Sequence, residues 1–506
     1  MREKYTREMT ETGDELIDTN KLFRALKVAP TTAVLSVSKI GGVRFGKHFS
    51  LEPNDVVAVK TDGLRLEFIG YEVSPGGCFS GTSLQRKSIT FEAIPFPGNV
   101  DPKSMVDEWA STARKLLRLP DMKSPIHRLP LLVLVNPKSG PGKSRHIWDT
   151  DGHRIICQEA GHSVDVVITE RASHALELLT EHDDLLAHYK GIVIVSGDGL
   201  MYEVIQGIMK RRDWAKVIRH MPIGILPGGS GNGLAKSINA AAGLPHSPLA
   251  SALTIARWKT SQLDIAAVDI LGDEAESIRV YSFLSLEWAI SADIDIGSEY
   301  LRFMGENRFT VEAIKRLLFL RKYNGRLEFL PAESTSQCLP KSAREIMKPV
   351  ESYWDYHDEI LDAPTPILTL LPPIDEPVPT SWVKVEDTFW NMWNCNVAWM
   401  SGGSQIAPDS HFGDGFIQLQ YLRDRNMNKW KLLKWLLGLD SGSHVNYSFN
   451  ETTPCQAYRF TPLPNPNGEL KGTIALDGEV VPYSTLQMQV LARFLTIFAV
   501  SFEGEP

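Results

Sequence analysis

Three stretches decide the fold: LLVLVNPKSGPGKS (131–144), IVIVSGDGLMYEVIQG (192–207) and IGILPGGSGNGLA (223–235). Each begins with a short apolar run, continues into a glycine-rich loop and ends in a helix-like segment. A fourth apolar run, Val164–Ile168, precedes the helix-like segment Ser173–Glu181. Short buried strands that alternate with helices predict a mostly parallel sheet covered on both faces.

The three glycine-rich loops indicate a phosphate site. In an open parallel sheet, ligands bind beyond the carboxyl ends of the strands. Glycines there let backbone N–H groups approach phosphate oxygens, and the following helix N-terminus adds positive potential. One such loop is more often an ordinary tight turn, but three on one sheet favour a nucleotide site. The first loop is not a P-loop, because Pro137 stands where that template requires glycine.

Asp198 is the candidate catalytic residue, because it lies between two glycines at a predicted strand end. A carboxylate there can accept a hydroxyl proton during attack on a γ-phosphate, or it can help to hold Mg²⁺. The alternative is an Asx turn or a helix N-cap. Glu203, five residues further on, is either part of the site or a solvent-facing helix residue.

A small β module precedes this region. Residues 1–19 are predicted to be a flexible N-terminus, and residues 20–118 contain β-branched and aromatic runs divided by turn residues. A helix opened by Asp101-Pro102 then follows, with apolar residues at helical spacing. The order resembles a pleckstrin-homology domain, and a generic β barrel without a ligand fits equally well.

Downstream of the α/β region at 129–256, the strands become longer and alternating. Residues 257–502 therefore predict a mostly antiparallel second lobe. Residues 331–381 are rich in proline and poor in periodic apolar residues, which predicts a flexible surface insertion. Two helix-like segments, Phe309–Lys322 and Trp430–Leu437, mix apolar residues with lysine and arginine. Each is either a helix packed in the core or a lid that touches anionic membrane, and core packing is favoured more strongly for the second.

Composition excludes several classes of protein. The 506 residues are 43% hydrophobic and 23% charged, as in globular proteins, and the net charge of −8 argues against a general nucleic-acid binder. The segment Met1–Glu15 has no apolar core of a signal peptide, and no apolar run is long enough for a membrane span. The five scattered cysteines suggest reduced thiols. We therefore expect a cytoplasmic protein whose membrane contact is peripheral.

The glycine-rich stretches, followed by Leu476-Asp477-Gly478-Glu479 (LDGE) near the C-terminus, look like those of sphingosine kinases. These belong to the wider diacylglycerol-kinase-type superfamily of lipid kinases. Ser196 and Leu200-Met201 resemble the sphingosine-kinase branch, as does FLSLEWAISADIDIGSEYLRFMGENRF (283–309). The resemblance implies an α/β two-lobed lipid kinase, with a parallel-sheet N-terminal lobe and a C-terminal antiparallel β-sandwich. Alone, Asp-Gly in LDGE favours a hairpin turn.

The resemblance also implies site residues. It assigns the catalytic base to Asp198, and it places the lipid head group on Ser196, Gly197, Asp198, Gly199 and Asp295. The implied cofactors are ATP and Mg²⁺, the latter without assigned ligands. The implied ATP contacts are Asn136, Pro137, Lys138, Thr169, Glu170, Arg171, Ala172, Ser173, Glu203, Gly229, Ser230, Gly231, Arg302, Arg308, Asp477, Gly478 and Glu479.

The expected activity is ATP-dependent phosphorylation of the primary hydroxyl of sphingosine or a related long-chain base. Asp295 can pair with the ammonium of such a base, whereas neutral diacylglycerol offers no such partner. Arg302 and Arg308 can neutralise charge on the transferred phosphoryl group. The alternatives are a ceramide or diacylglycerol kinase and, from a different class, a catalytically inactive lipid-binding scaffold.

Overall fold

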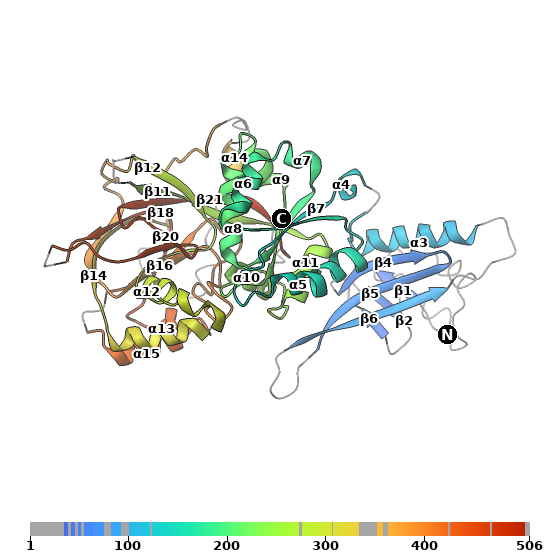
Figure 1. Cartoon of the computed structure of the whole chain (residues 1–506), viewed down its shortest axis with the longest axis horizontal. Coiled ribbons are helices and arrows are strands. Elements are labelled where there is room, and N and C mark those ends of the chain that lie inside the picture. The colour runs from blue at the N-terminus through green and yellow to red at the C-terminus, as the bar shows by residue number, and fades with distance from the viewer. Residues whose placement is uncertain are drawn as a thin grey trace. The chain divides into compact units, whose positions relative to one another are not determined.

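A computed structural model describes residues 35–38, 42–45, 49–51, 55–74, 82–92, 101–121, 124–272, 276–305, 307–332, 352–357, 363–423, 426–465 and 468–500 (Figure 1). The predicted flexible N-terminus, 1–19, lies outside these residues. The chain forms two compact units. The first comprises Met1–Leu131, Asp149–Val164 and Gly243–Lys259, and the second comprises Leu132–Trp148, Asp165–Ala242 and Thr260–Pro506.

The first unit contains two antiparallel sheets and the helix that the sequence predicts. Strands β1 (Leu35–Ser38), β2 (Gly42–Phe45) and β3 (Phe49–Leu51) form one sheet; β4 (Val56–Asp62), β5 (Arg65–Ser74) and β6 (Ser83–Glu92) form the other. Helix α3 (Pro102–Leu116) begins after Asp101, whose carboxylate accepts hydrogen bonds from two backbone N–H groups. The likeness to a pleckstrin-homology domain stays a prediction.

A buried carboxylate joins this N-terminal sheet to a later segment of the same unit. The π-helix η1 (Trp148–Glu159) ends at Glu159, which accepts hydrogen bonds from the Tyr71 hydroxyl at 2.9 Å and from Arg86 Nε at 2.9 Å. Helices α4 (Pro125–Arg128) and α11 (Pro248–Ala256) complete the described helices of the unit. Residues distant in sequence therefore share one unit. The domain boundaries predicted from the sequence stay predictions.

The second unit contains the predicted strand–loop–helix pattern. Its strands β7 (Leu131–Val135), β8 (Val164–Ile168), β9 (Gly191–Ser196) and β10 (Ile223–Pro227) are neighbours in the order β10-β9-β7-β8, and β9 and β10 are parallel. The accompanying helices are α5 (Ser144–Ile147), α6 (His174–Glu181), α7 (Leu185–His188), α8 (Asp198–Met209), α9 (Trp214–His220) and α10 (Gly233–Ala241). The mixed α/β prediction is confirmed.

The remaining strands are antiparallel and continue the same sheet through β21 (Leu486–Phe498), which pairs with β10. They are β11 (Thr260–Leu271), β12 (Ser277–Ser282), β13 (Ser285–Ala289), β14 (Tyr323–Pro331), β15 (Val383–Phe389), β16 (Asn391–Cys395), β17 (Ile417–Leu422), β18 (Glu451–Leu463), β19 (Ile474–Leu476) and β20 (Glu479–Val481). Trp288 on β13 packs against Phe460 on β18 at 4.5 Å between ring centroids. A hydrophobic core therefore lies between the antiparallel strands.

Part of the proline-rich segment differs from the loose surface insertion that the sequence predicts. In helix α14 (Tyr353–His357), Tyr353 and Trp354 are buried against Phe494, with ring centroids 5.0 and 5.1 Å away. Further along, the Arg459 guanidinium donates to the Pro373 carbonyl at 3.0 Å. Aromatic side chains and buried donors thus hold residues 352–357 and 363–381, although the segment lacks helical or strand periodicity.

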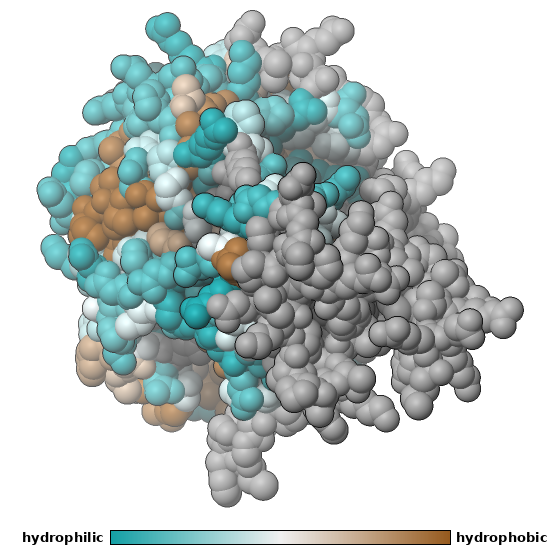
Figure 2. All heavy atoms as spheres, turned by 90° about the vertical axis from the view of Figure 1, so that its right-hand side faces the viewer, coloured by the Kyte–Doolittle hydropathy of each residue, from teal (hydrophilic) through white to brown (hydrophobic). Residues whose placement is uncertain are grey.

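Helices α12 (Ile290–Gly297), η2 (Glu299–Met304), α13 (Asn307–Leu318), α15 (Lys429–Leu437) and η4 (Ser443–Asn446) flank the antiparallel strands. Figure 1 shows α13 and α15 side by side, and Lys429 Nζ donates to the Leu318 carbonyl at 3.3 Å. Across the described ranges, no helix is both long and apolar enough to span a bilayer. On the face in Figure 2, the coloured residues are mostly hydrophilic, with a few hydrophobic patches.

Candidate active site

One cavity of about 810 Å³ in the second unit contains most of the predicted site. The three glycine-rich loops meet at its edge. A Cβ added to Gly229 would lie 2.4 Å from Gly197 Cα, and one added to Gly140 would lie 2.7 Å from the Gly229 carbonyl carbon. The Gly197 N–H also donates to Ser139 Oγ at 3.1 Å. Glycine is required here because three backbones pack where no side chain fits.

The structure brings most of the predicted residues to this cavity. Those that line it are Asn136, Lys138, Thr169, Glu170, Arg171, Ala172, Ser196, Gly197, Asp198, Gly199, Glu203, Gly229, Ser230, Gly231, Asp295, Arg308, Asp477, Gly478 and Glu479. Pro137 and Ser173 do not line it. Arg302 lies in η2, and its side chain is outside the described part of the structure.

Asp198 does not cap its own helix, which was one alternative from the sequence. It is the first residue of α8, and its buried carboxylate lies at the N-terminus of another helix, α10. Oδ2 accepts hydrogen bonds from the N–H groups of Asn232 and Gly233, both at 2.7 Å, and Oδ1 accepts one from Leu234 at 3.3 Å. Burial raises the pKa of Asp198 and these hydrogen bonds oppose the rise. The carboxylate is held in one orientation at the cavity wall.

The predicted Asp-Gly hairpin is present, and it has a second role. Asp477 and Gly478 both have positive φ between β19 and β20. The buried Asp477 carboxylate accepts from Ser282 Oγ at 2.7 Å and from three consecutive backbone N–H groups, those of residues 283–285, at 2.9 to 3.0 Å. Burial raises the pKa of Asp477 to about 6. This side chain anchors the turn before β13, whereas Glu479 is exposed beside Gly199.

Glu203 is not a solvent-facing helix residue. Its Oε2 accepts a hydrogen bond from the Ala175 N–H at 3.2 Å, in the first turn of α6. The carboxylate thereby satisfies one donor at that helix terminus and lines the cavity. Arg171 nearby is exposed and pairs with Glu177. Arg171 thus joins the Thr169–Ser173 loop to α6, and Glu203 of α8 holds the start of α6.

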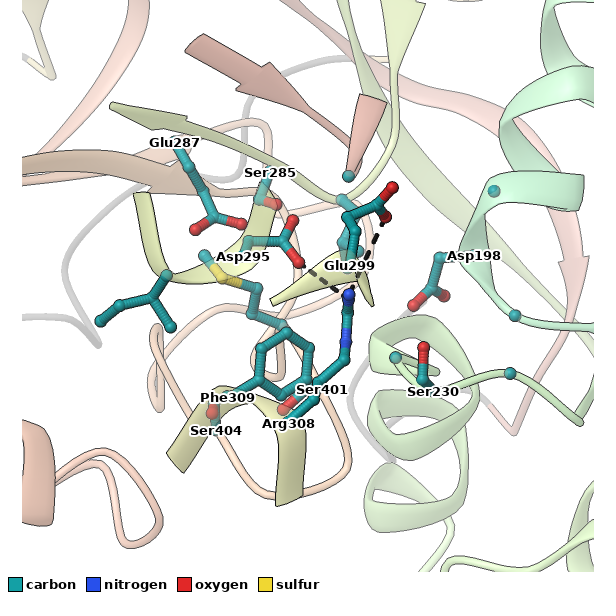
Figure 3. Close-up of a pocket in the computed structure, with 18 of the residues that line it drawn as sticks. Asp198, Ser230, Ser285, Glu287, Asp295, Glu299, Arg308, Phe309, Ser401 and Ser404 are labelled. Atoms are coloured by element: carbon teal, nitrogen blue, oxygen red, sulfur yellow. Dashed lines mark hydrogen bonds and ion pairs between the residues drawn. The ribbon is translucent and has the colours of Figure 1, made fainter. Parts of the chain in front are cut away.

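A charged group lies beyond Asp198 in the cavity (Figure 3). The buried Arg308 guanidinium donates from Nη2 to Asp295 Oδ1 at 2.9 Å and lies 3.8 Å from Glu299. Arg308 Nε and Nη1 are buried and make no hydrogen bond within the described residues. Asp293, two residues before Asp295, instead accepts a hydrogen bond from the Tyr323 hydroxyl at 2.6 Å and does not line the cavity.

The far part of the cavity is apolar, and α13 and α15 cover it. Its lining residues there include Phe309, Ala313, Leu317, Trp393, Ile406, Leu433, Trp435 and Leu436. Ile314 and Leu437 also line the cavity although they are largely exposed. The helix α13 is thus a wall of the pocket and not a helix enclosed in the core. Exposed Phe319 and Trp430 add apolar surface around these two helices.

Sequence reasoning missed several polar residues of the cavity, among them Ser285, Glu287, Ser291 and Glu299. The first two come from β13, whose alternation Ser285-Leu286-Glu287-Trp288 turns every second side chain to one face. That alternation is the sequence feature that could have predicted these two cavity residues. A glutamate in so apolar a strand is uncommon unless its environment uses it.

A Mg²⁺ ion in a protein needs several oxygen ligands, from side chains, backbone, substrate or water. Within the described ranges, no group of three or more histidine, cysteine, aspartate or glutamate side chains could hold a metal ion. Asp198 and Asp477 direct their oxygens to backbone N–H groups. A protein-only Mg²⁺ site therefore does not fit these residues. The glycine-rich loops, by contrast, fit the phosphates of a nucleotide.

The fold and cavity define a kinase of the diacylglycerol-kinase type, and residues 130–268 match the diacylglycerol kinase catalytic domain. Sphingosine kinase 1 of Arabidopsis thaliana is 32% identical over 69% of this chain and 68% of its own length; sphingosine kinase 1 of Homo sapiens is 31% identical over 74% and 92%. A putative diacylglycerol kinase structure from Bacillus anthracis has 12% identity and a TM-score of 0.48, covering 73% of this chain and 95% of its own.

The chain belongs to the sphingosine kinase family. It is accordingly an enzyme that transfers phosphoryl groups, with the lipid kinase activity of that family. The family predicted from the glycine-rich motifs is confirmed.

Proposed function

We propose that this enzyme transfers the γ-phosphoryl group of ATP to the primary hydroxyl of sphingosine or a related long-chain base, giving the 1-phosphate and ADP. One observation supports this most directly. A single cavity joins the glycine-rich loops, the Asp198 carboxylate and an apolar compartment that can hold an alkyl chain. The loops suit a polyphosphate, and the compartment suits a lipid.

Asp198 is the proposed general base. As the substrate oxygen forms its bond to the γ-phosphorus and the bond to the β-phosphate oxygen breaks, the hydroxyl proton passes to the Asp198 carboxylate. The three backbone N–H groups of residues 232–234 fix this carboxylate, so that it needs little reorganisation to act. Its raised pKa brings it closer to the working pH of a base.

Arg308 is the proposed stabiliser of the transferred group. Its Nε and Nη1 atoms are buried without a hydrogen-bond partner in the described residues, and a phosphoryl oxygen would supply one. Mg²⁺ would enter with the nucleotide, held mainly by phosphate oxygens and water, since the described side chains offer no dedicated cluster. Bound in that way, it would neutralise phosphate charge.

Asp295 is the proposed partner of the substrate ammonium. It already pairs with Arg308 at 2.9 Å, and the substrate ammonium would share this carboxylate with the guanidinium. A ceramide has no free amine, and diacylglycerol has none, so both would leave this contact unused. The preference for an amine separates the proposal from the ceramide and diacylglycerol alternatives.

We further propose peripheral contact with anionic membrane from a cytoplasmic location. The exposed side chains of Ile314, Phe319, Trp430 and Leu437 lie on the two helices over the apolar compartment or directly after one of them. Lys315 on α13 and Lys431 and Lys434 on α15 supply positive charge nearby. Apolar and cationic side chains together favour a membrane interface over bulk water.

The test is a side-by-side turnover assay with radiolabelled ATP and with sphingosine, ceramide or diacylglycerol in mixed micelles. We expect sphingosine to be phosphorylated, and Asp295→Asn to raise its KM about 10- to 150-fold while leaving the ATP KM nearly unchanged. Preference for ceramide or diacylglycerol would overturn the assignment. Absence of any melting shift at millimolar Mg·ATP would revive the inactive scaffold.

A further inference from the structure

Glu287 is a carboxyl group inside the lipid cavity to which the proposed mechanism gives no role. It lies in the middle of β13, where it pairs in register with Trp393 of β16 and Ala475 of β19. Its neighbours Leu286 and Trp288 face the hydrophobic core, so Ser285 and Glu287 face the cavity. Only 6% of Glu287 is exposed. A sheet with partners on both sides of β13 fixes its position.

The surroundings of Glu287 favour its protonated form. Burial raises the pKa of Glu287 well above its usual range, and the neighbouring Asp295 charge raises it further, while a hydrogen bond with Ser291 and the Arg308 charge lower it. A neutral carboxylic acid both donates and accepts hydrogen bonds. A protonated Glu287 therefore suits an uncharged hydroxyl of the substrate better than it suits a cation.

The polar side chains follow one another along the cavity. Figure 3 shows Asp198 on one side, Asp295 further in, and Glu287 beyond Asp295. In a long-chain base, the reacting hydroxyl is on C1, the amine is on C2, and the chain continues through C3 and C4. With C1 at Asp198 and the ammonium at Asp295, the next carbons pass Glu287. This order rests on the proposed function.

We propose that Glu287 is a specificity-determining residue that binds a hydroxyl group at C4, so that the preferred substrates are trihydroxy long-chain bases such as phytosphingosine. The C3 hydroxyl is common to all long-chain bases and cannot discriminate among them. A methylene or alkene carbon at C4 would place hydrocarbon against a buried acid, whereas a hydroxyl pairs with it. Sites built around a substrate hydroxyl discriminate strongly against analogues that lack it.

The test compares phytosphingosine with dihydrosphingosine, which differ only in the C4 hydroxyl, at saturating Mg·ATP. We expect the wild-type enzyme to favour phytosphingosine at least about 10-fold in kcat/KM. Glu287→Ala and Glu287→Leu should each lower this ratio about 10- to 100-fold, with the ATP KM unchanged. Glu287→Gln, whose amide also donates and accepts, should retain most of the preference.

A matched control is Glu386→Ala, which removes an exposed glutamate on β15 that pairs with Arg326 and should leave the ratio unchanged. A wild-type ratio near unity, or variants that slow both bases in equal proportion, would overturn the inference. The wild-type comparison decides even if the variants fold poorly. Phosphorylation of both bases alike refutes only the role of Glu287; phosphorylation of neither refutes the proposed function and this inference together.

Discussion

Asp198→Asn tests the proposed mechanism most sharply. The substitution keeps the shape of a buried side chain that both accepts hydrogen bonds from α10 and is the proposed proton acceptor. The carboxylate accepts two short hydrogen bonds at Oδ2 and one longer bond at Oδ1. The asparagine oxygen can replace Oδ2 and keep both 2.7 Å contacts with the N-terminus of α10. Its amide nitrogen then faces the Leu234 N–H, where the 3.3 Å bond is lost. The proton-accepting capacity disappears.

Two magnitudes follow from this geometry. Stability should fall by about 1–2 kcal/mol, because one weak bond is lost and two charge-assisted bonds become neutral, while the cost of burying the charge is removed. The rate should fall about 10²- to 10⁴-fold, as is common when a general base is removed. The loss of activity therefore greatly exceeds what mild destabilisation explains.

The assay measures single-turnover phosphoryl transfer to sphingosine, with the melting temperature and the shift induced by Mg·ATP recorded on the same samples. Asp477→Asn is the control, because the Asp477 carboxylate anchors residues 282–285. This variant should be destabilised more than Asp198→Asn. Its folded fraction should nevertheless have a higher kcat than Asp198→Asn. If Asp198→Asn keeps more than about a tenth of wild-type kcat, Asp198 only supports α10 and the reasoning is refuted.

Three further outcomes are expected. Gly229→Ala places a Cβ 2.4 Å from Gly197 Cα, so calorimetry should show weakened Mg·ATP binding and scanning fluorimetry a lower melting temperature; unchanged values would contradict the contact. Burial raises the pKa of Asp414 in the folded protein from 3.8 to about 6. The contribution of this group to the free energy of unfolding is therefore fully present below pH 4 and is lost as the pH rises through 6. In urea unfolding from pH 4 to 7, Asp414→Asn should reduce this fall in the free energy of unfolding, and parallel curves for the two proteins would refute this. Tyr71→Phe should speed hydrogen exchange in η1 without changing kcat, because Glu159 loses its 2.9 Å donor; equal exchange would show that this contact does not hold η1.

The strand–loop–helix order could be predicted from sequence because each piece is local. Apolar runs of about five residues followed by glycines specify β7, β9 and β10, and Asp101-Pro102 specifies the start of α3. Strand alternation likewise predicted the antiparallel half. The gathering of the three loops into one site followed from the topology of a parallel sheet, in which the strand ends meet at one edge.

The contacts between distant segments could not be predicted. Nothing local to Asp198 indicates that it caps α10, a helix that begins 35 positions later at Gly233. The LDGE hairpin was recognisable as a turn, but its bonds to residues 282–285 depend on how β19 pairs with β13. Similarly, Tyr353 and Trp354 lie in a segment without periodicity, and only the tertiary fold shows that they pack on Phe494.

The position of Asp198 also determines which backbone N–H groups remain available to a phosphate. The N-terminus of a helix is a ready site for a phosphate, yet the first N–H groups of α10 are directed to Asp198. A nucleotide phosphate would therefore depend on the loops around Gly140, Gly197 and Gly229, together with Arg308. The N–H groups of α10 orient the proposed base. Their hydrogen bonds lower the pKa of Asp198, but burial raises it by more, so the net shift is upward. In the proposed mechanism, the PGGSGNG segment would therefore orient the base with its last residues and contact the phosphate with its first.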